Sequence, residues 1–202
     1  MAEDKEHLIL ETARRHFVQN GYAATRMQEI ADDAGINKAL LHYYYRSKEK
    51  LYDRILTETM DFMVPKIAGA MISEGTFFER LEKLIEQYIS VLIEHPDIPF
   101  FILTEITQRK DKLVAEIRNR SHHFPAAQSF LMQMIKEMEE GKLKKMPPHQ
   151  VFLNIMSMTV FPFVVRPVFT TVFQQDENDF KSMMEERKKF LLEFMKGALK
   201  PD

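Results

Sequence analysis

Apolar residues recur every three to four positions along most of the chain, which is the spacing of helices that bury one face. The pattern begins with Ile9, Ala13 and Phe17 and continues into the last helix-like segment, which carries Phe180, Met184 and Leu191 on one side. Almost no segment alternates apolar and polar residues as a strand does, and no internal repeat is visible. We therefore predict an all-α protein of about nine helices.

Residues suited to helix ends divide the first part of the chain into short helices. Gly21 is placed to end the first helix in a left-handed conformation. Thr25 and Gln28 have the spacing of a capping box that would open the second helix. Asn37 and Ser47 are good N-caps for the third and fourth helices. The sequence thus predicts three short helices before a long fourth one.

Longer helices follow. The fourth should kink near Pro65, and Thr76 begins a second capping-box pattern before the next helix. Two more helices are expected over residues 99–109 and 111–140, the second interrupted near Pro125 and ended by a glycine.

The stretch from Val151 to Phe173 is apolar and long enough to resemble a membrane span. Arg166 lies inside it, however, and would cost about 2.5–3.5 kcal/mol at a bilayer centre. Asn154 and two prolines weaken a membrane assignment further. A helix buried in a core or at a subunit interface is the better interpretation, and we expect no membrane partner.

Composition limits the chemistry that this chain can perform. With 202 residues, the chain can form one core or join a small module to a larger one. It has no cysteine, which excludes disulfides, thiolate metal sites and thiol nucleophiles. The first ten residues lack the basic and apolar regions of a signal peptide, so we expect a cytoplasmic protein.

The net charge of −2 conceals a basic segment. The segment from Ile36 to Arg54 contains five Lys or Arg residues and two acidic residues, which gives a local charge of +3. A local basic patch matters more for nucleic-acid binding than the overall charge does.

The second and third predicted helices have the features of a helix-turn-helix. Ala31 is small enough for two helices to cross closely, and Gly35 can adopt the positive φ that the turn needs. Apolar residues lie at spacings that face the crossing: Ile30, Ala34, Ile36, Leu41 and Tyr44.

The third helix would then expose Asn37, Lys38, Ala39, His42 and Tyr43, where a recognition helix meets base edges and phosphates. Asn and Lys can donate to bases, and the small alanine permits close approach or contacts a thymine methyl group. The histidine and tyrosines can donate to phosphate oxygens.

Phosphate contacts are also expected at the ends of neighbouring helices. Lys48 would add its charge to the free N–H groups of the fourth helix, and Thr25 would act in the same way at the second. With the hydroxyl of Tyr44, these residues complete the predicted DNA-contacting set. The alternative is that Tyr44 and Tyr45 are core residues and that the lysines are only solvated, since helix-turn-helix geometry also occurs in proteins without a DNA function.

The order of residues in "TRMQEIADDAGINKALLHYYYRSKEKLYDRIL" resembles the DNA-binding segment of the tetracycline-repressor (TetR) family. The matching residues are Thr25, Ile30-Ala31, Ala34-Gly35-Ile36, Leu41, Tyr44-Tyr45 and Ser47-Lys48-Glu49. The family usually has tyrosine in place of His42 and often glycine in place of Ala39, which makes the base preference hard to predict. The specific resemblance covers about the first quarter of the chain.

This resemblance implies two domains and a function. It places a helix-turn-helix DNA-binding domain at residues 1–50, with the motif at about 26–45, and a ligand-binding and dimerisation domain at 51–202. The last two helices would pair with a second subunit. The implied function is that of a sequence-specific transcriptional regulator, a homodimeric repressor released by a small molecule from a near-palindromic operator.

The ligand is less well determined by the sequence. The chain has 14 methionines and 16 phenylalanines, which suit an adaptable apolar pocket or an ordinary core equally. Arg166 is a candidate partner for a ligand carboxylate, or else forms a structural salt bridge or lies at a subunit interface. His122 and His123 are adjacent and share no helix face, which disfavours a metal site. The predicted pocket residues are Phe101, His123, Phe124, Met156, Phe163 and Arg166; we expect no metal or cofactor and a largely apolar effector.

Three other functions are less compatible with the sequence. An enzyme is disfavoured because the sequence has no glycine-rich phosphate loop, no Gly-x-Ser-x-Gly motif and no His-x-x-x-His pair. A helical small-molecule-binding protein without a DNA function remains the main alternative. A protein that organises DNA without sequence preference is disfavoured by the overall acidic charge.

Overall fold

The computed structural model describes residues 2–201, and within them the chain forms eleven α-helices, one 3-10 turn and no strand. This confirms the all-α prediction. The two additional helices arise because the expected segments 111–140 and 151–173 are each divided in two. The chain separates into two compact units, Met1–Asp61 and Phe62–Asp202, and the boundary falls inside α4.

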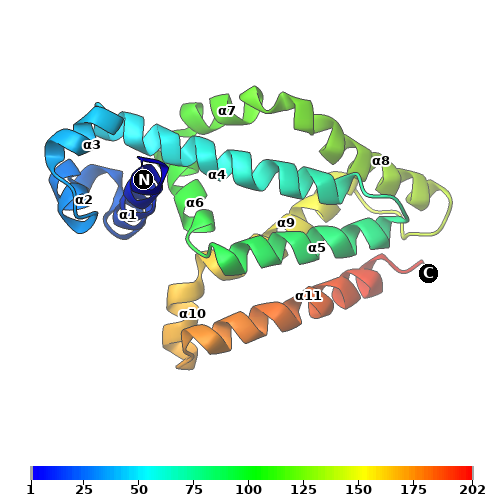
Figure 1. Ribbon diagram of the computed structural model, residues 1–202. Coiled ribbons are helices and arrows are strands. Elements are labelled where there is room, and N and C mark those ends of the chain that lie inside the picture. The colour runs from blue at the N-terminus through cyan, green and yellow to red at the C-terminus, as the bar shows by residue number, and fades with distance from the viewer. Residues whose placement is uncertain (1, 202) are drawn as a thin grey trace. The chain divides into compact units, whose positions relative to one another are not determined.

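The smaller unit contains α1 (Ala2–Ala24), α2 (Met27–Asp33), α3 (Lys38–Tyr44) and the first part of α4 (Lys48–Met71) (Figure 1). Its core is built around Phe17 and Tyr52, whose rings meet edge to face at a centroid distance of 4.7 Å. Tyr22 packs against both rings. The other large buried side chains come from all four helices: Ile9, Ile30, Leu41, Tyr45, Leu51 and Ile55.

Two predicted helix ends in this unit differ in detail. Helix α1 continues past Gly21 to Ala24, with a kink at the glycine, whose φ is 73°. The prediction that Thr25 and Gln28 form a capping box is wrong. Arg26 is the N-cap of α2, and its N–H donates to the carboxylate of Glu29 at 3.3 Å. The N-caps at Asn37, Ser47 and Thr76 are confirmed by their hydrogen bonds.

The larger unit is a bundle in which α5 is central, because it packs against α8, α9 and α11. Helices α5 and α11 run side by side (Figure 1). Its helices after α4 are α5 (Phe77–Glu94), α6 (Ile98–Gln108), α7 (Lys110–Asn119), the 3-10 turn η1 (Ser121–His123), α8 (Phe124–Glu139), α9 (Pro148–Val164), α10 (Arg166–Phe173) and α11 (Glu177–Leu199).

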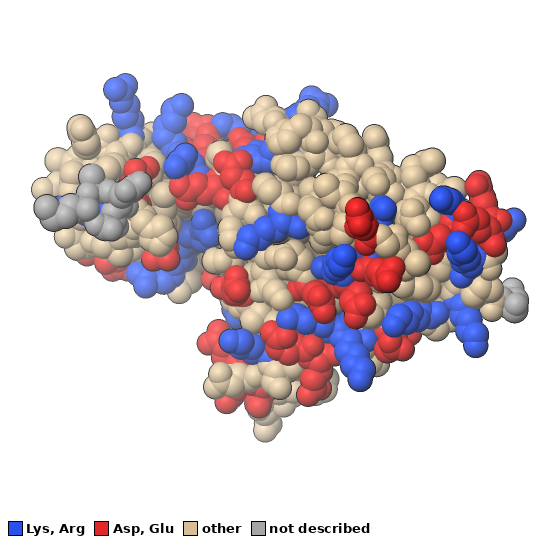
Figure 2. Space-filling view, turned by 45° about the vertical axis from the view of Figure 1, so that its right-hand side comes forward, with Lys and Arg blue, Asp and Glu red and all other residues tan. Residues whose placement is uncertain are grey.

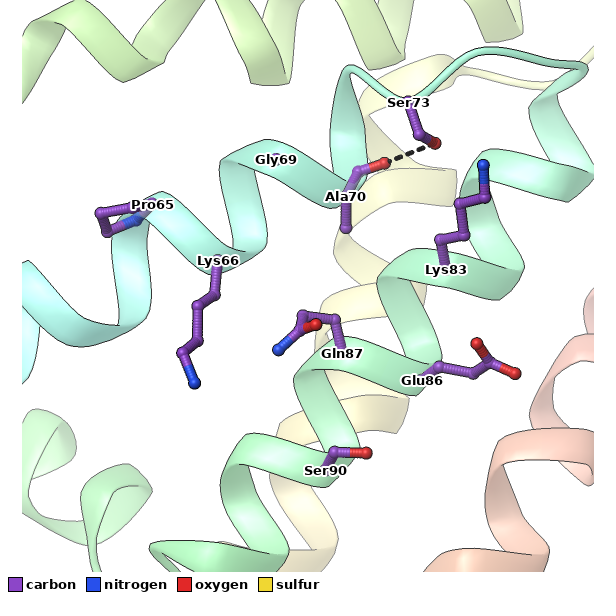
Figure 3. A pocket seen from close by; sticks show the side chains of 9 residues that line it. All are labelled: Pro65, Lys66, Gly69, Ala70, Ser73, Lys83, Glu86, Gln87 and Ser90. Atoms are coloured by element: carbon purple, nitrogen blue, oxygen red, sulfur yellow. Dashed lines mark hydrogen bonds between the residues drawn. The ribbon is translucent and has the colours of Figure 1, made fainter.

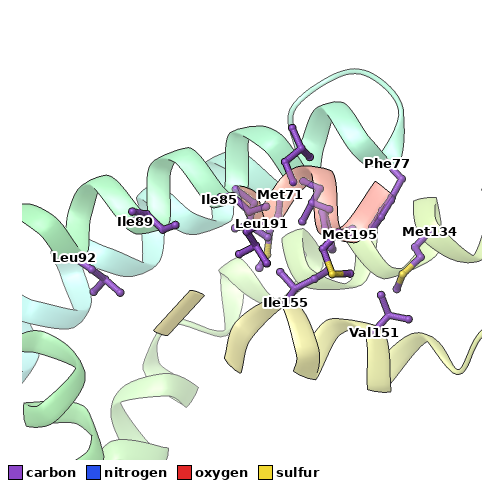
Figure 4. Packing of buried hydrophobic residues seen from close by; sticks show 14 of the residues in the cluster. Met71, Phe77, Ile85, Ile89, Leu92, Met134, Val151, Ile155, Leu191 and Met195 are labelled. Atoms are coloured by element: carbon purple, nitrogen blue, oxygen red, sulfur yellow. The ribbon is translucent and has the colours of Figure 1, made fainter. Parts of the chain in front are cut away.

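Apolar side chains from six helices meet in the core of this unit. Figure 4 shows Met71 of α4, Ile85 of α5, Ile155 of α9 and Met195 of α11 converging. One buried carboxylate also holds helices together, because Oε1 of Glu137 on α8 accepts a hydrogen bond of 2.7 Å from the first N–H of α5. A buried charge is tolerated here because it satisfies an otherwise unpaired backbone donor.

Helices α9 and α10 come from the apolar stretch that resembled a membrane span. They are bent by 63° relative to each other at Val165. In the part of the chain that the structure describes, no single helix has both the length and the hydropathy of a span, and only this bent pair reaches them together.

Candidate nucleic-acid interface

Two backbone hydrogen bonds hold the turn between α2 and α3. Gly35 has a φ of 64°, and its N–H donates to the carbonyl of Asp32 at 3.1 Å. The N–H of Ile36 donates to the carbonyl of Ala31 at 3.0 Å. A residue with a side chain would adopt this φ only with strain, which explains why glycine occupies the position.

Buried side chains fix the crossing of α2 and α3. Ile30, Ala31, Ala34 and Leu41 are almost completely buried, as predicted. The two helices therefore form a helix-turn-helix whose contact is apolar and buried, and one face of α3 remains exposed to solvent.

That exposed face carries five of the predicted DNA contacts. Asn37, Lys38, Ala39, His42 and Tyr43 are all exposed, and the tyrosine is exposed to 81%. The side-chain oxygen of Asn37 caps α3 by accepting a hydrogen bond of 2.7 Å from the N–H of Leu40. Its amide N–H₂ group points away from this bond as a donor for a base or a phosphate.

The three consecutive tyrosines have three different environments. Tyr43 is exposed, Tyr44 is half-buried with its ring against Tyr43, and Tyr45 is buried. The Tyr45 hydroxyl donates to Glu6 of α1 at 3.0 Å. Burial, with help from this carboxylate, raises the pKa of Tyr45 well above its usual range. The end of α3 is thus anchored to α1.

Thr25, predicted to contact phosphate, lies inside the smaller unit. Its side chain is buried, and its hydroxyl donates to the carbonyl oxygens of Gly21 at 2.8 Å and His16 at 3.1 Å. The structure therefore does not place this hydroxyl in the exposed set. It holds the kinked end of α1 in place.

Lys48, also predicted to contact phosphate, likewise donates its hydrogen bonds to backbone carbonyls within the unit. Its Nζ donates to three carbonyl oxygens at the end of α1, those of Tyr22 at 2.8 Å, Ala23 at 3.1 Å and Thr25 at 3.0 Å. The ammonium also lies 4.6 Å from the centre of the Tyr22 ring. An ammonium has three N–H donors, so these bonds use all of them. A cation is favourable there because the carboxyl end of a helix carries partial negative charge.

A further polar contact joins α1 to α2. Nε2 of His16 lies 2.8 Å from a carboxylate oxygen of Asp33, and Arg15 lies 3.6 Å from the same oxygen. The smaller unit is therefore braced on both sides of the helix-turn-helix, at Asp33 and at Lys48.

Three exposed cations of this unit lie outside the predicted DNA-contacting set: Arg26, and Arg46 and Lys50, which were counted only in the basic segment. The Arg26 side chain is exposed to 80% at the N-cap of α2, where an anion is also attracted by free backbone N–H groups. The sequence could have indicated this residue, because Arg26 directly follows Thr25, a residue already predicted to contact phosphate. Over the face drawn in Figure 2, basic and acidic side chains are interspersed, so no broad area of one charge covers it.

The predicted effector residues are only partly brought together. Phe163 and Arg166 line a cavity of about 350 Å³ with Ile93, Phe180 and Lys181. The guanidinium of Arg166 lies 3.6 Å from Asp97 and 3.5 Å from Glu177, so it forms the predicted salt bridges. The remaining predicted residues do not line this cavity: Phe101, His123, Phe124 and Met156.

Two other observations bear on ligands. A polar groove of about 570 Å³ lies between α4 and α5, and Figure 3 shows Lys66 and Gln87 extending into the space between these helices. The rings of His122 and His123 are in contact in η1, tilted by 44° with their centres 4.1 Å apart. Within residues 2–201 no group of three or more His, Asp or Glu side chains is arranged to hold a metal ion.

Comparison with known proteins agrees with this geometry. Residues 9–55 match the model of bacterial regulatory proteins of the tetR family, and residues 78–195 match that of the tetracyclin repressor-like C-terminal domain. The fold and the exposed α3 face define a helix-turn-helix transcriptional regulator that binds DNA. The chain belongs to the tetracycline-repressor family.

Individual relatives are distant. The chain is 27% identical over 124 residues to the uncharacterised HTH-type transcriptional regulator YhgD of Bacillus subtilis, a match that spans 56% of this chain and 65% of that protein, just under two thirds. It is 24% identical over 189 residues to the probable HTH-type regulator YttP of the same organism, covering 89% and 88% of the two chains. The solved structure of the ketosteroid transcriptional regulator KstR2 of Mycobacterium tuberculosis is similar with a TM-score of 0.72 at 17% identity, over 98% of this chain and 95% of that one.

Proposed function

We propose that the protein is a homodimeric repressor that leaves a near-palindromic operator when a small molecule binds to its larger unit. The observation that carries this proposal is that α3 buries one face against α2 and leaves its other face exposed. The amide N–H₂ of Asn37 and the side chains of Lys38 and Tyr43 are exposed on a rigid helix, and they match the edges and phosphates of a major groove.

Each exposed residue has a chemical role in this proposal. The amide of Asn37 and the ammonium of Lys38 donate to base edges or phosphates, and Ala39 allows the helix to approach closely. His42 and Tyr43 donate to phosphate oxygens. The exposed cations Arg26, Arg46 and Lys50 add sequence-independent affinity that depends on salt.

Dimerisation is supported by apolar surface on α9 and α11. Leu153 and Phe161 of α9 are exposed to 56% and 60%, and Phe190 and Phe194 of α11 to 63% and 50%. Phe190 and Phe194 lie one turn apart with their rings nearly parallel. Monomeric proteins rarely expose four such side chains on two neighbouring elements, and a second copy of the same face would cover them.

A two-fold dimer presents two recognition helices to one side of the DNA. Half-sites one helical turn apart, about 34–36 Å, then follow from the symmetry, and the operator repeats its sequence in inverted order. The α10 residues Val168, Val172 and Phe173 are also exposed, next to this face in sequence, and would extend it.

The cavity at Arg166 is the proposed effector site. Ile93, Phe163 and Phe180 give it apolar walls, while Arg166 and Lys181 supply two cations. The ion pairs of Arg166 are long, and the Glu177 side chain is exposed to 85%, so an anionic ligand group can replace that carboxylate. This combination suits a small, mainly apolar molecule with a carboxylate.

Effector binding would act through a coupling free energy between the two units. A coupling of about 1–3 kcal/mol changes operator affinity by about 5–150-fold.

We assign no catalytic activity to the protein. We place it in the bacterial cytoplasm, because that is where its DNA partner lies. The main alternative is a helical small-molecule-binding protein that does not bind DNA.

The test is a binding measurement with DNA from upstream of the protein's own gene, with random duplex as the control, over a series of salt concentrations. We expect specific binding that Lys38→Ala combined with Tyr43→Ala abolishes, while Lys38→Ala alone lowers the salt slope by about 1. The matched control is Lys142→Ala, which removes an exposed lysine of the larger unit. Equal affinity for both duplexes would indicate DNA organisation without sequence preference, and no binding at low salt would leave the small-molecule-binding alternative.

The effector site is tested separately by thermal unfolding with medium-chain carboxylic acids and the matching primary alcohols. We expect the acids to stabilise the protein more than the alcohols do, and Arg166→Met to remove the difference. Lys66→Met alters the polar groove instead and serves as the control. If only the control variant loses the response, the effector binds in the groove between α4 and α5.

A further inference from the structure

Helix α9 contains a proline in its interior, at position 162. Proline has no backbone N–H, so the carbonyl of Met158, four residues earlier, cannot receive the hydrogen bond that continues an α-helix. An unsatisfied carbonyl in a half-buried position is costly, and a helix usually bends to expose it to water.

Here a side chain from another helix satisfies this carbonyl. Arg187 of α11 donates two hydrogen bonds to the carbonyl oxygen of Met158, from Nε at 3.0 Å and from Nη2 at 2.9 Å. The two residues are 29 positions apart in the sequence. Burial lowers the pKa of Arg187 from its ordinary value, but a guanidinium stays charged under all physiological conditions, so these bonds are charge-assisted.

The role of Arg187 is hydrogen bonding to backbone, because none of the carboxylates within residues 5–201 forms an ion pair with it. The next basic residue of α11 behaves differently: Lys188 pairs with Glu185 on its own helix. Arg187 is therefore the side chain that connects α11 to the interrupted part of α9.

We propose that Arg187 replaces the N–H donor missing at Pro162 and thereby sets the geometry of the face through which two subunits pair. This inference rests on the proposed dimerisation through α9 and α11. Phe161 lies three residues after Met158, and Phe190 lies three residues after Arg187. Residues three apart are neighbours on a helix surface, so the bond lies one turn from an exposed phenylalanine on each helix.

The test is a double-mutant cycle, because Pro162→Ala restores the N–H that Arg187 replaces. We expect Arg187→Met to raise the dimer dissociation constant about tenfold in the native background, which corresponds to about 1.4 kcal/mol. In the Pro162→Ala background we expect the same substitution to raise it by less than about twofold, because Met158 again has a backbone donor. Sedimentation velocity over a dilution series measures both constants.

Two further variants test the mechanism. Arg187→Lys keeps the charge but offers one flexible donor group, and we expect an intermediate dissociation constant. Lys188→Met removes a charge from the next position of α11, and we expect the dimer to be unaffected. A loss with Arg187→Met that is equal in both backgrounds would overturn the proposal, since Arg187 would then act independently of Pro162.

A separate variant distinguishes failure of this inference from failure of the proposed dimer. Phe190→Ser should dissociate the dimer whether or not Arg187 acts as proposed. If Phe190→Ser leaves the dimer intact, subunits pair elsewhere and the proposed link between the bond and dimerisation is overturned. The urea midpoints of the four cycle proteins would then report whether Arg187 and Pro162 are coupled within one subunit.

Discussion

The interactions that stabilise the smaller unit differ in kind from those that stabilise the larger unit. In the smaller unit, side chains bond to particular backbone groups at nearly every helix end: Asn37 and Ser47 cap α3 and α4, and Thr25 and Lys48 bind the end of α1. In the larger unit, a methionine-rich apolar core provides most of the contact, and polar side chains add single bonds between helices, such as those of Glu137 and Arg187.

This difference reflects what each unit must do. A DNA-binding helix has to present its donors at fixed positions, and directional hydrogen bonds at its ends hold it there. An effector domain has to admit a molecule and respond to it, and an apolar core with flexible methionines allows repacking. The following variants test this contrast, in order of decreasing expected effect.

Loss of core packing should have the largest effect. Met134→Ala removes a fully buried side chain of α8, and we expect it to lower the free energy of unfolding by about 2–5 kcal/mol in urea denaturation. The matched control is Met132→Ala on the same helix, where the side chain is exposed to 63% and the change should stay within about 0.5 kcal/mol. Similar losses for both would mean that burial does not govern the stability of this unit.

The smaller unit should be sensitive to a single cation. Lys48→Met removes all three hydrogen bonds to the end of α1, and we expect a loss of about 1.5–3 kcal/mol in unfolding free energy. Lys50→Met changes an exposed lysine two positions later and should be nearly neutral for stability. Operator affinity would decline for both if both contact phosphate, so the contrast in stability is the decisive result.

Glycine substitutions should have opposite signs at two positions. Gly35→Ala forces an L-residue into a φ of 64°, at a cost of about 1–2 kcal/mol. Gly69→Ala lies within α4, where added helix propensity should stabilise by about 0.5–1 kcal/mol. In both cases the new Cβ has no neighbouring atom within 4 Å, so thermal denaturation reports backbone conformation alone. Destabilisation of equal size at both positions would contradict this explanation.

The smallest effect at neutral pH should come from Tyr88 of α5. Burial raises its pKa to about 12 from an ordinary value of 10.0. The unfolded chain therefore ionises first, and this contribution to stability is complete below pH 10 and is lost as the pH rises towards 12. We expect Tyr88→Phe to change the urea midpoint little at pH 7 and to reduce its decline at pH 11. Tyr43→Phe, at an exposed ring, should leave that decline unchanged.

The helix-turn-helix could be predicted from sequence because its determinants are local. The small residue, the glycine and the apolar residues of the crossing lie within 15 positions of one another, from Ile30 to Tyr44. The hydrogen bonds of Thr25 and Lys48 to the end of α1 could not be predicted in the same way. Lys48 binds carbonyls 23 to 26 residues away, and sequence spacing gives no information on such contacts.

Prolines explain most of the errors in the larger unit. The break expected near Pro125 lies at residues 120–123, because Pro125 occupies the first turn of α8, where proline is tolerated. Pro167 similarly begins α10. The cavity at Arg166 could not be predicted because its walls come from four helices, α5, α9, α10 and α11, whose packing is not encoded in any one segment.

The boundary between the units lies within a continuous helix, and this has a consequence for how such proteins can be recombined. At Asp61 and Phe62 there is no linker to absorb a change of length. Each inserted residue advances α4 by about 1.5 Å and rotates all that follows by about 100°. Seven added residues nearly complete two turns and return close to the original phase. In a functional chimera joined at this point, the number of residues inserted into α4 must therefore keep the rotation of the helix close to a whole number of turns. Insertions of about seven residues should be tolerated better than insertions of two or five.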